Sequence, residues 1–158
     1  MKCNLLLDEK IILLNKSDEL LDQLFMVATA FGGLLLGASA LFPWSHHGVG
    51  SAISVVNFGN LALSGEIASS VPMWVGVFMY CIPLGGGVII VGSGIKGLAG
   101  KILQILGTIL GVSSASILTF VLLFHLHGGP GFGMILGDIG AFVVLAIIAG
   151  RVIRKTLS

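Results

Sequence analysis

The most informative part of the chain runs from residue 71 to residue 124 and reads VPMWVGVFMYCIPLGGGVIIVGSGIKGLAGKILQILGTILGVSSASILTFVLLF. It contains two apolar stretches, residues 71–95 and 102–124, which carry no charged side chain and flank a turn with Lys96 and Lys101. Each stretch has at least the roughly 20 residues that an α-helix needs to cross a hydrocarbon layer of about 30 Å. The pattern therefore predicts two consecutive transmembrane helices.

Two further apolar stretches lie at residues 24–42 and 132–150, the second of which contains Asp138, so four spans are predicted. The whole chain is 56% hydrophobic and 9% charged, whereas soluble proteins have about 25% charged residues. Its mean hydropathy is +1.09. We expect an all-α integral membrane protein, in which residues 23–155 form a four-helix bundle and residues 1–22 form a short cytoplasmic N-terminal segment. The net charge of +1, without a basic patch, gives no indication of nucleic-acid binding.

The basic residues give the expected orientation, because segments 43–70 and 125–131 contain no Lys or Arg. Basic residues instead precede the first span, bracket the turn between the second and third, and follow the fourth: Lys2, Lys10, Lys16, Lys96, Lys101, Arg151, Arg154 and Lys155. Loops rich in Lys and Arg stay on the cytoplasmic side. We therefore expect a multi-pass plasma-membrane protein with both termini in the cytoplasm, whose first span is a retained signal-anchor.

The N-terminal segment has apolar clusters at residues 5–7 and 11–14, separated by charged residues. This recurrence predicts a short amphipathic helix that lies at the cytoplasmic interface or on a partner subunit. A disordered tail is the alternative. Ser17 is followed by Asp18 and Glu19, an arrangement typical of a helix N-cap, so we expect a new helix to begin there and run into the first span.

Three spans contain pairs of glycines four residues apart, which let helix backbones approach closely in lipid. The pairs are Gly33 and Gly37, Gly107 and Gly111, and Gly133 and Gly137. We expect them to pack within one molecule rather than between two. The second span differs, because Pro83 precedes Gly85–Gly87 and predicts a kink at mid-membrane.

Segment 43–70 is the sizeable loop on the expected outer side. Trp44 and Trp74 fall at its two ends, where an indole can bury its ring and keep its N–H in water, so both are expected to be interfacial anchors. The loop has many apolar residues for its length, which is unusual for a structureless linker. It predicts a short hairpin, an interfacial helix lying across the bundle, or a docking surface for a partner.

The order of these features resembles a known group of proteins. The elements are Pro43-Trp44 after the first span, Gly65-Glu66-Ile67 at the end of the outer loop, the lysine turn, a GPGFGMIL stretch at residues 129–136, and a basic end. They are similar to those of small four-span membrane proteins of actinobacteria and some archaea that have no agreed biochemical activity. The resemblance implies the four-span topology and a prokaryotic plasma membrane, and it carries over no catalytic residue.

All four histidines are expected to collect at the outer face, together with two acids: His46, His47, His125, His127, Asp138 and Glu66. Neutral imidazoles with a carboxylate can hold Zn²⁺ or Cu²⁺. Three interpretations stay open: ordinary interfacial histidines, a metal or haem site, and a polar patch that handles protons or a ligand. No cofactor is required by the sequence.

Asp138 is the most informative single residue, because an ionisable group inside a span normally faces protein or water. Its expected partners are His125 or His127, the Ser113/Ser114/Ser116 group on the third span, or a second protein. The alternative is a carboxylate that reaches up to outer water.

Enzyme signatures are missing from the sequence: there is no His-Glu-x-x-His, no Gly-x-Ser-x-Gly and no Gly-x-x-x-x-Gly-Lys. We therefore expect a non-catalytic integral membrane subunit that packs into or stabilises a larger envelope complex. The alternatives are a small metal- or ligand-binding membrane protein that uses the outer histidines, and a homo-oligomeric pore. The expected partners are the lipid bilayer and other membrane subunits or further copies of the chain.

Overall fold

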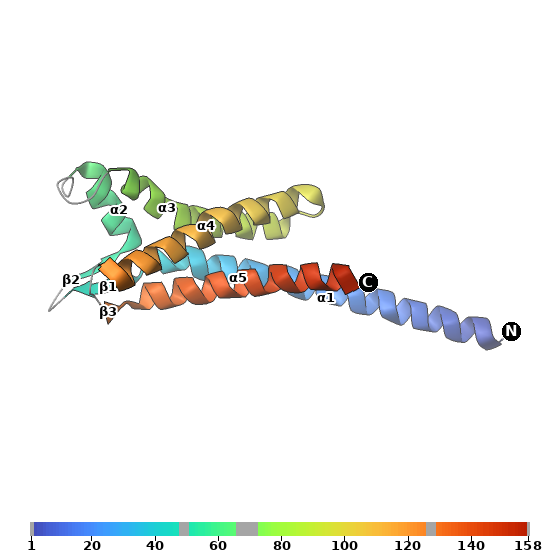
Figure 1. Ribbon diagram of the computed structural model, residues 1–158. Coiled ribbons are helices and arrows are strands. Elements are labelled where there is room, and N and C mark those ends of the chain that lie inside the picture. Colours follow the sequence, from blue (N-terminus) through green and yellow to red (C-terminus); the bar gives the residue numbers. More distant parts are fainter. Residues whose placement is uncertain (1, 48–50, 66–72, 126–128, 158) are drawn as a thin grey trace.

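The computed structural model describes residues 2–47, 51–65, 73–125 and 129–157 (Figure 1). Within these residues the chain forms five helices and three short strands. In chain order they are α1 (Lys2–Ser39), β1 (Pro43–His47), β2 (Ser51–Ser54), α2 (Val55–Ser64), α3 (Met73–Gly94), α4 (Leu98–His125), β3 (Gly129–Pro130) and α5 (Phe132–Leu157). The described chain is nearly all helical.

Four of the helices, α1, α3, α4 and α5, are long and apolar enough to cross a membrane, which confirms the four predicted spans as helices. Their candidate spans are Lys16–Ser39, Trp74–Gly94, Leu98–Phe120 and Phe132–Arg154. The chain ends and the α3–α4 turn point to one end of the molecule, called here the turn end (Figure 1). The strands and α2 lie at the other end, called here the sheet end.

The first helix is one continuous element from Lys2 to Ser39, so the expected helix start at Ser17 is wrong. A serine acts as an N-cap only where the backbone enters a helix from a non-helical conformation. Residues 15–19 contain neither glycine nor proline and have helix-forming sequence on both sides. At 1.5 Å per residue, the 38 residues of α1 extend for about 57 Å.

The described parts of segment 43–70 contain both a hairpin and a helix, two structures that the sequence offered as alternatives. Strand β1 pairs with β2 in an antiparallel hairpin. Strand β3 pairs with the other edge of β1, so the strand order is β2-β1-β3. The Oγ atom of Ser54 accepts a hydrogen bond from the backbone N–H of Asn57 at 3.2 Å and caps α2. Gly65, with φ of 81°, ends α2. The all-α prediction is therefore incomplete, because it missed this sheet.

Helix α1 packs against both α3 and α5, and α3 packs against α4. The contact between α4 and α5 is smaller. Leu36, Ile82, Ile89 and Val144, which come from α1, α3 and α5, are completely buried. These residues lie near the C-terminal end of α1 and in the middle parts of α3 and α5.

Helix α3 approaches two neighbours through adjacent glycines. A Cβ atom added at Gly85 would lie 2.4 Å from the Cα atom of Gly111 on α4. One added at Gly86 would lie 2.6 Å from the carbonyl oxygen of Gly33 on α1. Real Cβ atoms essentially never come within 3.0 Å of such atoms, so both positions need glycine for this packing. Gly87 is different, because an added Cβ would meet nothing within 4 Å.

The glycine pairs of α1 and α4 thus face α3 within one molecule. Added Cβ atoms would lie 2.8 Å from Ile89 Cγ2 at Gly33, 2.8 Å from the Gly85 carbonyl oxygen at Gly107, and 2.6 Å from Leu36 Cδ2 at Gly111. At Gly37 the nearest atom would be 3.8 Å away, so this glycine has ordinary van der Waals room. Helix α3 continues through Pro83 without interruption.

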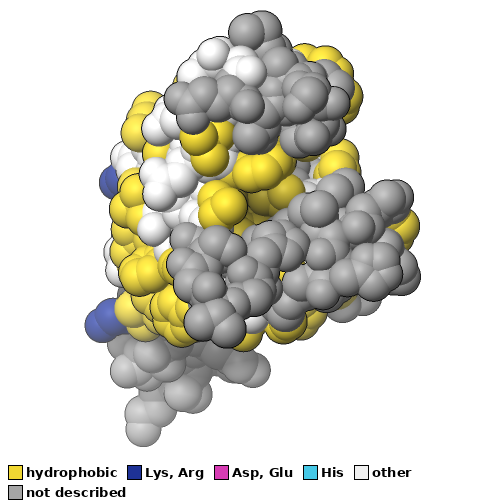
Figure 2. Space-filling model, turned by 90° about the vertical axis from the view of Figure 1, so that its left-hand side faces the viewer, with side chains coloured by type: hydrophobic (Ala, Val, Ile, Leu, Met, Phe, Trp, Pro, Cys, Tyr) yellow, Lys and Arg dark blue, Asp and Glu magenta, His cyan; other side chains and the backbone are white. Residues whose placement is uncertain are grey.

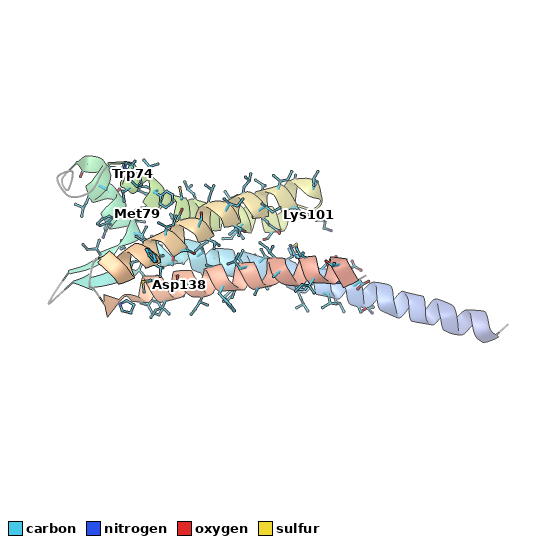
Figure 3. The ribbon with its side chains drawn as sticks, in the orientation of Figure 1. Trp74, Met79, Lys101 and Asp138 are labelled. Carbon is cyan, nitrogen blue, oxygen red and sulfur yellow. The ribbon has the colours of Figure 1, made fainter. Side chains whose placement is uncertain are left out.

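Trp44 is buried, with only 2% of its surface exposed, so the expected interfacial role of this indole is wrong. Its Nε1–H donates a hydrogen bond to the carbonyl oxygen of Ser39 at 2.7 Å. Added Cβ atoms at Gly133 and Gly137 of α5 would lie 2.6 and 2.8 Å from the indole ring. This glycine pair therefore packs against the aromatic ring and against the end of α1 at Ser39. Trp74, in contrast, is 67% exposed and points away from α4 and α5 (Figure 3).

Helix α2 is attached to α3 by the same kind of close contact. A Cβ atom added at Gly76 would lie 2.9 Å from the carbonyl oxygen of Gly59. The hydroxyl group of Tyr80 on α3 also donates a hydrogen bond to the side chain of Asn60 on α2. These two glycines, which are not among the pairs noted in the sequence, hold α2 close to α3.

Candidate functional site

Asp138 of α5 contacts α4 near the sheet end (Figure 3). The side chain is half-buried, and its Oδ1 atom accepts a hydrogen bond from Thr119 Oγ1 at 3.0 Å. The carboxylate thus contacts the third span, as one of the expectations had it. The partner is Thr119, however, and not Ser113, Ser114 or Ser116.

The hydroxyl groups of α4 point to different sides of the helix. Thr108 and Ser114 are buried, whereas Ser113 and Ser116 are exposed. The Thr108 hydroxyl donates to the carbonyl oxygen of Gln104 at 2.6 Å, and the Ser113 hydroxyl donates to that of Ile109. The Thr108 and Ser113 hydroxyls thus bond to their own helix, and the four side chains do not share one face of α4.

Gln104 joins three helices near the turn end. Its Nε2 atom donates to the carbonyl oxygen of Gly92 on α3 at 3.2 Å, and its Oε1 atom accepts from Arg151 Nη1 on α5 at 2.9 Å. The side chain is 8% exposed. Gln104 is not among the site residues predicted from the sequence, although an amide within an otherwise apolar helix is a signal that it needs a partner in protein.

Arg151 is half-buried between α1, α4 and α5. Its guanidinium carbon lies 5.7 Å from the centre of the Phe25 ring on α1, a distance typical of a cation–π contact. In the sequence, this arginine was only one of the basic residues that indicate the orientation of the protein in the membrane. In the structure it also connects the ends of the spans.

Arg154, one helical turn further along α5, pairs with two acids of α1. It contacts Asp18, and its Nη1 atom lies 3.2 Å from Asp22 Oδ1. Asp18 and Asp22 remain mostly exposed. These ion pairs hold the C-terminal part of α5 against α1, just where the N-terminal part of α1 leaves the body of the molecule.

The histidines that the sequence grouped together are only partly within the described residues. His46 and His47 belong to β1, and His46 pairs through its backbone with Ala52 and Gly129. His125 is the last residue of α4. His127 and Glu66 lie outside the described residues. The backbone thus brings three histidines to the sheet end (Figure 1), and the described atoms at the front of Figure 2 are hydrophobic or otherwise uncharged.

No group of three or more possible metal ligands is found in the described part of the chain. Asp138, the one acid expected in this group whose side chain is described, contacts Thr119. A metal site that uses the histidines therefore stays a prediction.

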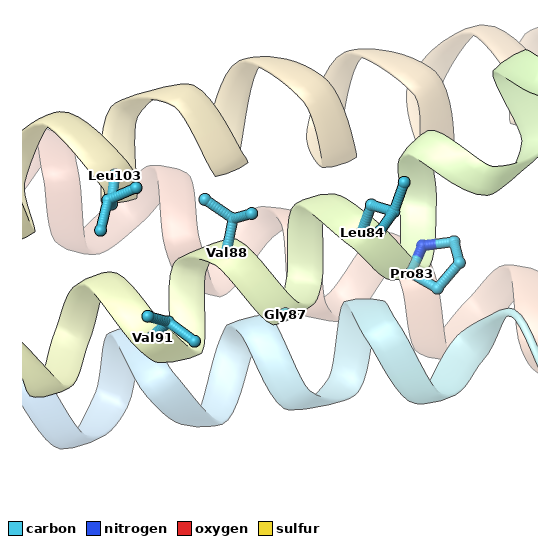
Figure 4. Close-up of a pocket in the computed structure, with 6 residues that line it drawn as sticks. All are labelled: Pro83, Leu84, Gly87, Val88, Val91 and Leu103. Carbon is cyan, nitrogen blue, oxygen red and sulfur yellow. The ribbon is translucent and has the colours of Figure 1, made fainter.

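An open apolar depression lies along α3 and reaches Leu103 of α4 (Figure 4). It includes Gly87, where an added Cβ atom would meet nothing within 4 Å. It is lined by Pro83, Leu84, Gly87, Val88, Val91 and Leu103. Leu84 and Val91 are 62% and 58% exposed. The lining offers van der Waals contact and no acid, base or nucleophile.

Asp138, Gln104 and Arg151 thus connect neighbouring helices through hydrogen bonds, whereas the Thr108 hydroxyl bonds to its own helix. Every buried side-chain nitrogen or oxygen atom in the described residues has a hydrogen-bond partner. Such satisfaction is expected for groups that stabilise a fold, because an unpaired polar atom in a low-dielectric interior is costly. Comparison of the chain with family models, with curated proteins and with solved structures found no match.

Proposed function

We propose that this protein is a non-catalytic integral membrane subunit that packs into and stabilises a larger complex of the cell envelope. The observation that carries the proposal is the N-terminal part of α1, which continues the first span and projects beyond the end of α5 (Figure 1). The length of about 57 Å is nearly twice the thickness of the hydrocarbon layer. A lone helix of about 12–15 residues is marginally stable in water, so a partner would stabilise this extension.

The extension has an apolar repeat that suits contact with another helix. Leucine pairs occur at residues 6–7, 13–14 and 20–21, which are seven residues apart. Residues at this spacing share one side of a helix. Leu20 and Leu21 are 54% and 42% exposed, so the molecule itself leaves this pair largely uncovered. A partner that buried the pairs at residues 6–7 and 13–14 would remove their apolar surface from water, and it would meet the third pair within the candidate span Lys16–Ser39.

We further propose that the spans form a four-helix bundle in a prokaryotic plasma membrane, with the turn end in the cytoplasm. The positions of the basic residues along the chain support this orientation, since all of them flank the spans on the turn-end side. Cysteine labelling from outside intact cells tests it. A cysteine at the exposed position Ser64 should be labelled and one at Gly97 should be protected, and the reverse pattern would overturn the orientation.

Photo-crosslinking in the native membrane tests the subunit role. A photoreactive amino acid at Leu13, in the projecting repeat, should give one discrete adduct with another envelope protein. The matched control is Phe142 on α5, which is 73% exposed within a span and should react mainly with lipid. An adduct of twice the chain mass would instead support self-association, and the lack of a protein adduct at Leu6, Leu13 and Leu20 would contradict the proposal.

A further inference from the structure

Two arginines one turn apart on α5 have very different surroundings. Arg154 contacts two carboxylates, Asp18 and Asp22. Arg151 contacts a neutral amide, Gln104, and the neutral ring of Phe25. Among the described residues, no carboxylate lies within ion-pair distance of Arg151. Its positive charge is therefore not balanced by the described part of the protein, although the side chain is half-buried.

The contacts of Arg151 hold the guanidinium in place and leave donors for another group. A guanidinium has five N–H donors in a rigid plane, and Gln104 accepts a hydrogen bond from one nitrogen, Nη1. Gln104 is itself fixed by its bond to the Gly92 carbonyl oxygen. An arginine whose position is set in this way loses less side-chain entropy when it binds an anion, and its planar fork fits phosphate oxygens.

The site lies where membrane phosphates are found. Arg151 is near the end of the candidate span Phe132–Arg154, and Gln104 is near the start of the candidate span Leu98–Phe120. Lys101 precedes Gln104 by one turn on α4, is exposed, and lies at the turn end (Figure 3). A second cation thus stands at the same membrane boundary, without an ion pair among the described residues.

We propose that Arg151, positioned by Gln104 and assisted by Lys101, binds the phosphate of an anionic phospholipid headgroup at the turn end. The aqueous side of the site adjoins the membrane surface, and basic sites between transmembrane helices are suited to anionic headgroups. The apolar neighbours along α4 and α5 would lie beside the acyl chains of the same lipid. This inference does not depend on the proposed subunit role, because it concerns the lipid and not a protein partner.

Native mass spectrometry of the full chain in mild detergent tests the proposal, with phosphatidylglycerol or phosphatidylcholine added in separate titrations. The parent protein should retain phosphatidylglycerol in preference to phosphatidylcholine. Arg151→Gln should weaken retention of phosphatidylglycerol about tenfold, equal to about 1.4 kcal/mol. Arg154→Gln removes the same formal charge one turn away. It should change the retention of phosphatidylglycerol by less than about twofold, since Arg154 is already paired with carboxylates.

Further variants separate a built site from general attraction to charge. Arg151→Lys keeps the charge and loses the planar fork, so it should bind more weakly than the parent and more tightly than Arg151→Gln. Gln104→Leu should weaken retention while all basic residues remain. Equal losses for Arg151→Gln and Arg154→Gln would overturn the proposal, and so would full retention by Arg151→Gln.

A competition experiment with inorganic phosphate distinguishes a lipid headgroup from a free phosphate ion as the ligand. In large excess it should leave phosphatidylglycerol bound, because the lipid is also held by its acyl chains. Complete displacement by inorganic phosphate would show a site for the free anion and overturn the assignment to lipid. Circular dichroism of each variant, compared with the parent, separates loss of binding from loss of structure. If Arg151→Gln does not fold, the comparison of Arg151→Lys with the parent still decides the outcome.

Discussion

The contacts that α3 makes with α1 and α4 differ in kind from those between α4 and α5. In the first region Gly85 and Gly86 bring backbones together, and an added methyl group would collide with main-chain atoms. In the second region the helices touch less, and two side-chain pairs, Thr119 with Asp138 and Gln104 with Arg151, connect them near opposite ends. Because lipid supplies little hydrophobic drive between helices, a membrane protein can use either close van der Waals contact or hydrogen bonds.

The two regions should therefore tolerate different kinds of substitution. Close backbone packing fails when bulk is added, since neither helix has a flexible side chain that can move aside. A contact through long side chains tolerates small changes in bulk, and it depends instead on the polar partners. Four comparisons follow, in order of decreasing expected effect.

The largest effect is expected for Gly85→Ala. Its new Cβ atom would lie 2.4 Å from Gly111 Cα, so α3 and α4 must separate, at a cost of about 3 kcal/mol of folding free energy. Gly87→Ala is the matched control, because its Cβ atom meets nothing within 4 Å, and it should change stability by less than about 1 kcal/mol. Thermal unfolding in detergent measures both. Equal melting temperatures for the two variants would show that α3 and α4 are not in backbone contact at Gly85.

Gln104→Leu should come next. The change removes the bonds to the Gly92 carbonyl oxygen and to Arg151, and it leaves the half-buried guanidinium without its acceptor, at a cost of about 1–3 kcal/mol. Ser116→Ala removes an exposed polar group from the same helix and should leave the melting temperature unchanged. A Gln104→Leu variant as stable as the parent would mean that the three-helix connection contributes little.

Asp138 and Thr119 should show a smaller, shared effect. Asp138→Leu should lower stability more than Asp138→Asn, because asparagine can still accept a hydrogen bond from Thr119 Oγ1. In a double-mutant cycle of Asp138→Leu with Thr119→Val, measured by thermal unfolding, the coupling should be about 0.6 kcal/mol and at most about 1.7, as for other hydrogen bonds between membrane helices. If Asp138→Leu stabilised the protein, the hydrogen bond between Asp138 and Thr119 of α4 would not contribute to its stability.

The smallest effect is expected at the exposed ion pairs of Arg154. Asp18→Asn and Asp22→Asn should each lower stability by less than about 1 kcal/mol, since the side chains of Asp18 and Asp22 are 62% and 77% exposed. The difference from the parent should shrink further at high salt, because exposed charges are screened. A large loss that persists in high salt would show that these pairs are shielded from water.

The candidate site could be predicted from the sequence only in part. Asp138 stood out because a charge within an apolar span is rare, and its contact with the third span was among the stated alternatives. Thr119 could not be chosen over the serines of α4, since the choice depends on how far α4 is rotated about its axis and how far α5 is shifted along it. Gln104 and Arg151 are 47 residues apart in the chain, and their pairing depends on the same rotation and shift.

From the sequence alone one can predict the four apolar helices and the positions of the basic residues at their ends, and the glycine pairs indicate close packing, although Gly37 has ordinary van der Waals room. Hydropathy, length and residue size are local properties, so they can be read without knowing the neighbours. The tertiary structure decided which glycine meets which backbone, and it gave Gly85 and Gly86 contacts on two sides while Gly87 has none. It also buried Trp44 against α5, because Gly133 and Gly137 leave room for the indole where β1 crosses the start of that helix. These outcomes depend on contacts between distant segments, for which local sequence carries no information about rotation or register.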